Sequence, residues 1–434
     1  MRDSVALQRY LQRHIETNLP RHSFAQPHWL YVVVIPAYQE SPALLQTLRQ
    51  MPEGSGRTLI ILVLNRPDTD SNTQANAALR DALQSQSLQR TQRCSLSVQC
   101  LNNHTDLYVH DCELLQGATP ASLGVGLARK IGCDLALQWM IGGGISGQWL
   151  YCTDADASVP QDYFYQLDGA PSHAVAAVFR FQHRPAGEEA CDSATALYEL
   201  RLHHYVLGLK YAGSPYAHHS LGSCIAIRAD AYAQVRGFPK RAGAEDFYIL
   251  NKLAKIAPIH NLSGDSIQLL SRQSTRVPFG TGPAVAAIVA TGRPEDVRIF
   301  EHPRCFEALK ALLASLPDLT KSPCADFCSM LVGQGLDDNE AEKSNIALQA
   351  LGIQRGLEHC HRQSRSSEQF KRQFHQWFDA LRTLKFLHLM RDAGWEKQSL
   401  TQLEALRPNL WPAINQTPQT ANRLRSVLSG LDYN

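Results

Sequence analysis

The sequence has no continuous run of about 20 apolar residues, the length that a helix needs to cross a membrane. The nearest stretch, residues 131–150, is interrupted by Asp134, two glutamines and a glycine cluster. The first 20 residues carry charged side chains throughout, so they do not resemble a secretory signal peptide. We therefore expect a soluble protein without a transmembrane segment, whose sequence stays compatible with peripheral membrane contact.

Paired cysteine motifs are also missing. The 11 cysteines are scattered and odd in number, and no two of them form a Cys-x-x-Cys pair. This pattern argues against a disulfide framework and favours free thiols in a reducing compartment. A cytoplasmic location is the expectation.

The chain has no excess of one charge. Its 42 basic and 40 acidic side chains give a formal net charge of +2, without a basic block. A nucleic-acid partner is therefore not expected. The hydrophobic fraction of 44% is enough for a sizeable core, and 434 residues suggest two or three domains, or one large domain with an appendage.

Apolar strands alternate with helical patterns over the first two thirds of the chain. Residues 31–35 and 59–64 are continuous apolar runs, typical of buried parallel strands, and amphipathic segments follow them. This order predicts an α/β fold with a mixed, mostly parallel sheet. After about residue 300, strands disappear and helical periodicity takes over. We expect an N-terminal helix and linker at 1–26, an α/β domain at 27–300 and a helical C-terminal region at 301–434.

An acidic turn follows one of the predicted strands. The apolar run 149–152 is succeeded at once by Asp154 and Asp156. Ligands of open α/β sheets bind at the carboxyl ends of strands, and paired carboxylates are hard ligands that suit Mg²⁺ or Mn²⁺. The alternative is an ordinary Asp-rich turn.

A second acidic pair, Glu245 and Asp246, opens a predicted helix. Negative charge is favoured in a first helical turn, so we expect Asp246 to be ionised, as a general base must be before it acts. The alternative is a first turn with no catalytic role.

Basic side chains that match phosphate oxygens occur in a glycine-containing loop at 271–282. Arg272 and Arg276 of this loop are candidates to hold a diphosphate, because guanidinium binds phosphate oxygens in a bidentate manner. Arg129 is a further candidate for the same task. Two solvated surface arginines are the alternative interpretation of the loop.

Four segments in fixed order resemble the family-2 glycosyltransferases of the GT-A fold. These segments are VVVIPAYQE, YCTDADASVP, GSCIAIRADAYAQVRGFP and AEDFYILNKL. They resemble that family's opening strand, its D-x-D element, its acceptor-side strand with a Gly-Phe turn, and its Glu-Asp pair. The resemblance covers roughly residues 30–282 and implies a Rossmann-like, nucleotide-sugar-binding GT-A domain.

The resemblance implies metal-dependent transfer of a sugar from a UDP-, GDP- or dTDP-sugar donor to an acceptor hydroxyl, with inversion. The acceptor would be a glycan, a lipid-linked molecule or a small molecule. Asp156 would bind the metal, and Asp154 would bind the ribose, the metal or a metal-bound water. Asp246 would be the general base and Glu245 would orient the acceptor. The nucleoside pocket would be lined by Pro36, Ala37, Tyr38, Glu40 and Asn65.

Some positions depart from the family pattern. Asn65 stands where many members have an acidic residue that holds the nucleobase, although its amide can also hydrogen-bond a base. The sequence Gln273-x-x-Arg276-Val277 is similar to the Q-x-x-R-W element of processive synthases, with Val277 in place of Trp. Because those enzymes also carry membrane helices, processive polymer synthesis is not expected.

Two rival functions remain open. A sugar-phosphate nucleotidyltransferase shares an α/β nucleotide-binding core, but a glycine-rich, arginine-bearing loop usually follows its first strand, where this chain has Pro36-Ala37-Tyr38. A non-catalytic module that binds glycans or partners on a degenerate transferase fold is the second rival. The intact D-x-D and Glu-Asp pairs argue against it.

Overall fold

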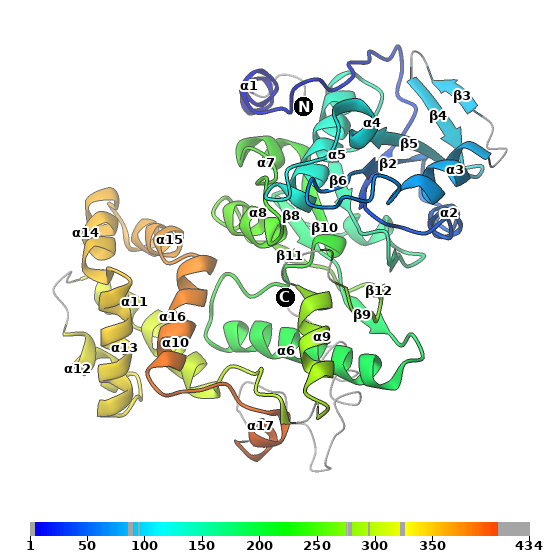
Figure 1. The fold of residues 1–434 in the computed structure, drawn as a ribbon. Coiled ribbons are helices and arrows are strands. Elements are labelled where there is room, and N and C mark those ends of the chain that lie inside the picture. The colour runs from blue at the N-terminus through cyan, green and yellow to red at the C-terminus, as the bar shows by residue number, and fades with distance from the viewer. Residues whose placement is uncertain are drawn as a thin grey trace. The chain divides into compact units, whose positions relative to one another are not determined.

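The computed structural model describes residues 5–85, 90–93, 96–274, 276, 280–293, 296–321 and 326–406. The chain divides into two compact units (Figure 1). The first unit holds the chain up to Gly187 together with Ser220–Pro283, and the second holds Glu188–His219 and the chain from Ala284 onward. The domain ranges expected from the sequence, with boundaries after 26 and 300, stay a prediction.

The centre of the first unit is a group of four parallel strands. In spatial order these are β6 (Trp149–Cys152), β1 (Tyr31–Ala37), β2 (Thr58–Leu64) and β5 (Thr105–Asp111). Every residue of β1 and β2 is buried. An unbroken run of β-branched and other apolar side chains suits a strand that is covered on both faces. The two strands predicted at 31–35 and 59–64 are confirmed.

Five further strands extend this sheet on both sides. Next to β6 lie β10 (Ile225–Arg228), β8 (Ala176–Val178) and β11 (His260–Asn261), and next to β5 lie β4 (Leu96–Cys100) and β3 (Arg90–Arg93). Among the described strands of this sheet, only β4 and β10 run against the others. The predicted α/β class with a mixed, mostly parallel sheet is therefore confirmed.

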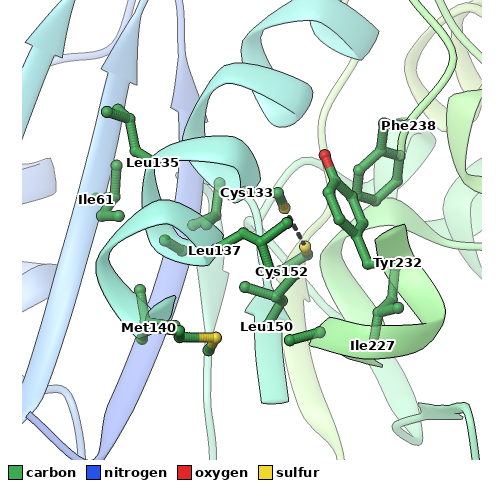
Figure 2. Close-up of a cluster of buried hydrophobic side chains, with 14 of the residues drawn as sticks. Ile61, Cys133, Leu135, Leu137, Met140, Leu150, Cys152, Ile227, Tyr232 and Phe238 are labelled. Carbon is green, nitrogen blue, oxygen red and sulfur yellow. Dashed lines mark hydrogen bonds between the residues drawn. The ribbon is translucent and has the colours of Figure 1, made fainter. Parts of the chain in front are cut away.

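Helix α5 (Gly124–Ile141) packs directly on the central strands β1, β2 and β6. Its approach is close at Gly132, where an added Cβ atom would lie 2.3 Å from a methyl group of Val34. Figure 2 shows the core around α5, where its side chains meet those of β6, β10 and helix α7 (Ala229–Gln234). The thiols of Cys133 and Cys152 lie 3.7 Å apart in this core. Because α5 is fixed against three strands, it can carry polar groups to defined positions.

A buried polar cluster joins the N-terminal helix α1 (Val5–Arg13) to α5. The ammonium of Lys130 donates to Asp134 at 2.8 Å and to the hydroxyl of Tyr10 at 2.5 Å. Asp134 also accepts hydrogen bonds from Tyr10 at 2.5 Å and from Tyr232 at 2.9 Å. Burial raises the pKa of Asp134, while Lys130 opposes this shift. The cluster thus satisfies a buried carboxylate with several partners, as burial of a charge requires.

A small three-stranded sheet lies at the carboxyl end of β6. Its central strand β12 (Ile267–Leu270) pairs with β7 (Ala157–Ser158) in antiparallel fashion and with β9 (Phe181–Arg184) in parallel. The chain that leaves β6 enters β7 after the acidic turn, and the basic loop follows β12. This pairing therefore brings the acidic turn and the basic loop to one place.

The remaining helices of the first unit are short and cover the sheet. They are α2 (Leu44–Arg49), α3 (Ala77–Ser85), α4 (Cys112–Gln116) and α8 (Glu245–Leu253), with single 3₁₀ turns at Tyr165–Leu167 and Gly222–Cys224.

The second unit is helical in its described residues. Helix α6 (Glu189–Tyr211) packs with helices from the later part of the chain around one apolar core. The later helices are α9 (Thr281–Ala290), α10 (Pro303–Ala314), α11 (Leu316–Leu319), α12 (Phe327–Gly333), α13 (Asp338–Ala350), α14 (Ile353–Gln363), α15 (Ser367–Trp377), α16 (Ala380–Asp392) and α17 (Leu400–Leu406). Three aromatic side chains of α15 and the residue that follows it, Phe370, Phe374 and Phe378, belong to the apolar core.

Membrane-spanning helices were not expected, and no helix in the described ranges is long and apolar enough to cross a bilayer. The helical C-terminal region predicted from the sequence is confirmed as far as residue 406. Residues 407–434 of that prediction lie outside the described part of the chain.

Candidate active site

The candidate site lies where parallel strands of the first unit end. Pro36 and Ala37 are the last two residues of β1, in register with Val63 and Leu64 of β2. The backbone of Asn65 donates to the carbonyl of Ala37 at 3.1 Å, so the chain ends of these two neighbouring strands stay together beyond the sheet. The carboxyl ends of parallel strands are the ordinary place for ligands in such sheets.

The acidic turn after β6 is anchored to the same edge. The amide of Thr153 donates to the carbonyl of Val34 at 3.2 Å, and the amide of Ala157 donates to the carbonyl of Asp154 at 3.1 Å. The chain therefore turns sharply between Asp154 and β7. This turn presents both carboxylates, Asp154 and Asp156, at the strand end.

Arg129 joins the two acidic pairs. Its Nη2 atom donates to Asp154 at 2.8 Å, and its Nε atom donates to Glu245 at 3.1 Å. The whole residue is 2% exposed, although the sequence suggests Arg129 as a diphosphate ligand. Burial acts to lower the pKa of Arg129, but the two carboxylates outweigh burial and raise it. The guanidinium is therefore a permanent buried cation between Asp154 and Glu245.

The basic loop after β12 reaches the acidic turn and the end of β1. Arg272 forms an ion pair with Asp156 at 2.5 Å, and its guanidinium lies 3.9 Å from Glu40. Arg276 pairs with Glu40 and donates to the carbonyl of Tyr38 at 2.7 Å. Burial raises the pKa of Glu40, and Arg276 opposes that shift. Both arginines thus lie among the candidate site residues, while Val277 lies outside the described part of the chain.

Asp156 is a perturbed carboxylate. Burial, followed by the charge of Asp154, raises its pKa to about 6, and Arg276 acts in the opposite direction. The direct ion pair with Arg272 also favours the ionised form. At neutral pH Asp156 is therefore mainly ionised, and its charge is balanced by neighbouring arginines.

Glu245 and Asp246 begin helix α8, but they differ in environment. Glu245 is buried against Arg129, whereas Asp246 accepts a hydrogen bond from the backbone of Phe247 at 2.7 Å. The sequence predicts an ionised Asp246 because of the helix N-terminus. Burial and the charge of Glu245 instead raise the pKa of Asp246 to about 7. Asp246 therefore exchanges its proton closer to neutral pH than an ordinary aspartate does, which suits a general base.

The backbone is strained at two positions beside the candidate residues. Gln39, between Tyr38 and Glu40, has a φ angle of 54°, and Ala244, directly before Glu245, has a φ angle of 56°. Left-handed backbone is unfavourable for residues with a Cβ atom and is often found at functional sites. The strain at Gln39 is held in part by Asn76, whose side chain accepts from the Gln39 amide at 3.0 Å.

Some contributors at this edge carry no clear signal in the sequence. Asp70 accepts from the hydroxyl of Tyr38 at 2.6 Å, and burial followed by this contact raises the pKa of Tyr38 to about 12. Asn76 is fully buried and donates to the carbonyl of Asn65 at 3.1 Å. Both residues lie in a polar stretch after β2 where turns also occur. Only their tertiary contacts identify them as supports of the predicted nucleoside pocket.

A cavity of about 210 Å³ lies beside the acidic turn. It lies between the turn and helix α2, and its walls mix apolar and polar side chains. Its lining includes Ile35, Leu44 and Met51 as well as Thr47, Asp154 and Gln161.

The donor set suits a divalent cation that is shared with a ligand. Asp154 and Asp156 supply carboxylate oxygens, and each has a second oxygen beyond its ion pair with arginine. Mg²⁺ is commonly held by one or two carboxylates, with water and substrate phosphates completing the shell. In the described ranges no three His, Cys, Asp or Glu side chains gather as a metal-binding group. The two residues therefore fit a Mg²⁺ or Mn²⁺ that a phosphate ligand would help to hold.

No protein-family model and no curated protein sequence matches the chain. Solved structures are similar in chain trace. TarS 1-349 of S. aureus is 14% identical, with 79% of this chain and 89% of that chain covered and a TM-score of 0.34. A mannosyltransferase from Pyrobaculum calidifontis, PcManGT in complex with GDP-Man and Mn²⁺, is 14% identical, with coverages of 90% and 93% and a TM-score of 0.34. Mouse xyloside xylosyltransferase 1 is 12% identical, with coverages of 54% and 85% and a TM-score of 0.27. At these values, what the chain does has to be inferred from its own side chains.

Proposed function

We propose that the protein is a glycosyltransferase, which moves a sugar from a nucleoside diphosphate donor to an acceptor hydroxyl. The observation that carries this proposal is the link between the two acidic pairs. Arg129 contacts Asp154 of the first pair and Glu245 of the second. The proposed donor-binding pair and the pair that contains the proposed base are therefore joined through one residue, which would bring donor and acceptor together for in-line displacement.

The donor half consists of the acidic turn, the basic loop and the end of β1. Asp154 and Asp156 would hold Mg²⁺ or Mn²⁺, which when bound serves as a Lewis acid for the diphosphate. Arg272 and Arg276 would bind diphosphate oxygens, and their present carboxylate partners show that these guanidinium groups can reach the acidic turn and β1. Pro36, Ala37, Tyr38, Glu40 and Asn65 would line the nucleoside pocket.

The acceptor half is the start of α8. Asp246 would take the proton from the acceptor hydroxyl, and its raised pKa of about 7 supports this role, since a base works best near the pH at which it operates. Glu245 would orient this half through Arg129. A single carboxylate base implies direct displacement, so inversion at the anomeric carbon is the proposed outcome.

The donor is a UDP-, GDP- or dTDP-sugar, and the acceptor is a glycan, a lipid-linked molecule or a small molecule. A cytoplasmic location is proposed from the cysteines. The nine that the structure describes are free thiols, including Cys133 and Cys152, whose sulfur atoms lie 3.7 Å apart without a bond.

A thermal-shift screen tests this proposal directly. The protein is heated with UDP-, GDP-, dTDP- and CDP-sugars, each with and without Mn²⁺. We expect one donor class to raise the melting temperature, and Mn²⁺ to enlarge the rise, because a bound ligand stabilises the folded state. No metal-dependent shift with any donor would contradict the proposal.

Further ligands in the same assay, together with a measurement of donor hydrolysis, separate the rival functions. A nucleotidyltransferase would respond to a nucleoside triphosphate together with a sugar phosphate. A non-catalytic glycan-binding module would respond to glycans and would leave the donor unchanged in the presence of Mn²⁺.

A further inference from the structure

We propose that Arg129 is a positioning residue, which fixes the carboxylates of Asp154 and Glu245 relative to one another and does not itself bind the donor diphosphate. The names of the two sides, donor and acceptor, rest on the proposed function. The arrangement itself rests on the contacts of Arg129.

All three nitrogen atoms of the Arg129 guanidinium are engaged within the protein. Nη2 donates to Asp154 at 2.8 Å, Nε to Glu245 at 3.1 Å, and Nη1 to the carbonyl of Gly222 at 2.9 Å. The planar fork of arginine offers donors in fixed directions. A cation with three such partners sets the distance and the orientation between the groups that it contacts.

The surroundings of Arg129 come from separate parts of the chain. Gly222 precedes strand β10, and the ring of Phe238, 6.0 Å from the guanidinium carbon, belongs to the turn after α7. Farther toward the N-terminus of α5, the amide of Gly126 donates to the carbonyl of Arg241 at 3.0 Å. Helix α5 therefore holds the segment that leads into α8, and Arg129 extends this attachment to the acidic turn after β6.

Burial distinguishes Arg129 from the arginines of the basic loop. Its side chain is 3% exposed, whereas that of Arg272 is 33% exposed. A diphosphate would have to displace two carboxylates and a carbonyl to reach Arg129. Leaving the buried carboxylate of Glu245 or the buried carbonyl of Gly222 without a partner is costly. Arg272 has only to exchange Asp156 for a phosphate oxygen.

Nucleotide binding separates positioning from direct contact. The affinity of the full chain for UDP and for GDP is measured by calorimetry, with EDTA and with Mn²⁺, for wild type, Arg129→Lys and Arg272→Gln. Lysine keeps the charge but cannot hold two carboxylates in a fork. In EDTA we expect Arg129→Lys to bind nucleotide with the wild-type affinity. The factor by which Mn²⁺ strengthens nucleotide binding should be about tenfold smaller in Arg129→Lys than in wild type, because Asp154 is no longer fixed. Arg272→Gln should lose affinity in both conditions.

Two results would overturn the proposal. Equal losses of affinity for Arg129→Lys and Arg272→Gln in EDTA would mean that Arg129 contacts the diphosphate. Wild-type affinity of Arg129→Lys in both conditions would mean that the position of Asp154 does not depend on Arg129.

Gly222 provides an independent variant that removes no polar group. An added Cβ atom at Gly222 would lie 2.4 Å from Nη2 of Arg129, so Gly222→Ala must displace the guanidinium. We expect Gly222→Ala to show the same selective loss with Mn²⁺, and to lower kcat more than it raises the donor KM. Gly169→Ala is the matched control, because its added Cβ meets no atom within 4 Å. A Gly222→Ala protein that behaves like Gly169→Ala would contradict the proposal.

Unfolding measurements test the shared cation without any nucleotide. The urea midpoint is compared for wild type, Asp154→Asn, Glu245→Gln and the double variant. Removing the second carboxylate leaves a buried cation without a charged partner, so Glu245→Gln should lower the midpoint more in the Asp154→Asn background. If Glu245→Gln lowers the urea midpoint equally in wild type and in Asp154→Asn, then Asp154 and Glu245 are not coupled through Arg129. If wild type binds no nucleotide, the proposed function fails, and this measurement still decides the role of Arg129.

Discussion

Asp154 and Glu245 are remote in sequence, yet both accept a hydrogen bond from the guanidinium of Arg129. Asp154 follows a central strand and Glu245 begins a helix that comes after the antiparallel strand β10. The buried cation between them compensates two negative charges that would otherwise repel one another. The proposed donor and acceptor halves are therefore parts of one electrostatic unit.

Replacing the proposed base should stop transfer and spare donor binding. We expect Asp246→Asn to lower kcat at least about 100-fold, the usual range for loss of general-base catalysis. Calorimetry with the donor checks that its affinity is unchanged. Asp230→Asn is a matched control, since Asp230 also lies in the first turn of a helix but pairs with Arg228. Near-normal turnover by Asp246→Asn would refute the assignment.

The rate of transfer should depend on the protonation of Asp246. Its pKa of about 7 means that the active, ionised form declines as pH falls, so kcat/KM should drop about tenfold per unit just below pH 7 and more steeply below pH 6, where Asp156 is also protonated. The charge of Glu245 contributes to the high pKa. Glu245→Gln should therefore move this acid limb to lower pH. A limb that stays in place, measured over pH 5 to 9, would exclude Asp246 as the titrating group.

The same carboxylate should make the fold less stable at high pH. Its folded pKa of about 7 exceeds the ordinary value of 3.8, so the folded state binds more protons between these values than the unfolded state. The free energy of unfolding therefore falls as pH rises through this window. Asp246→Asn has no carboxylate to ionise at this position, so its free energy of unfolding does not fall for this reason. Its melting temperature relative to wild type should therefore rise from pH 4 to pH 8. A difference that does not change with pH would contradict this prediction.

Arg272 should contribute to diphosphate affinity, because its ion pair with Asp156 is partly exposed and can be exchanged for a phosphate oxygen. Arg272→Gln is expected to weaken UDP or GDP binding about tenfold, the typical loss for a hydrogen bond to a charged group. Arg57→Gln is the control, because Arg57 pairs with Asp106 near the beginnings of strands β2 and β5, at the opposite edge of the sheet. Equal losses for both variants would indicate a general effect on folding.

The buried cluster around Asp134 should be important for stability alone. Asp134→Asn leaves the buried Lys130 with only the more distant carboxylate of Glu16, 3.9 Å away, and is expected to lower the free energy of unfolding by about 3 kcal/mol. Asp318→Asn removes the partner of the exposed Lys321 and should change the free energy of unfolding by less than about 1 kcal/mol. Urea denaturation measures the free energy of unfolding of both variants. Similar losses in Asp134→Asn and Asp318→Asn would refute the special importance of the buried cluster.

The central strands and the acidic turn could be predicted from the sequence because their signals are local. Strand β5 could not, since the buried polar residues Asp106 and His110 interrupt its apolar pattern. The apolar run at 174–181 contributes to both β8 and β9, which lie in different sheets, because sheet membership depends on tertiary pairing and not on the local pattern.

In the candidate site, too, some features follow from neighbouring residues and others depend on the tertiary fold. The positions of Asp154 and Asp246 at a strand end and a helix start follow from neighbouring residues. The burial of Arg129 and of Asp246 does not, because burial depends on groups that are distant in sequence. Burial is the main cause of the raised pKa of Asp246, and the charge of the adjacent Glu245 adds to it. A local rule, the favourable helix N-terminus, predicted an ionised Asp246, and desolvation by the tertiary fold outweighed it.

Release of nucleoside diphosphate tests the central claim most directly. Wild type and Asp156→Asn are incubated with UDP-, GDP- and dTDP-sugars, with Mn²⁺ or with EDTA, and the released diphosphate is quantified. We predict release from one donor class by wild type with Mn²⁺, and a loss of at least about 100-fold in Asp156→Asn, since the proposed metal ligand is removed. Equal release by both proteins, or none by wild type from any donor, would contradict the account.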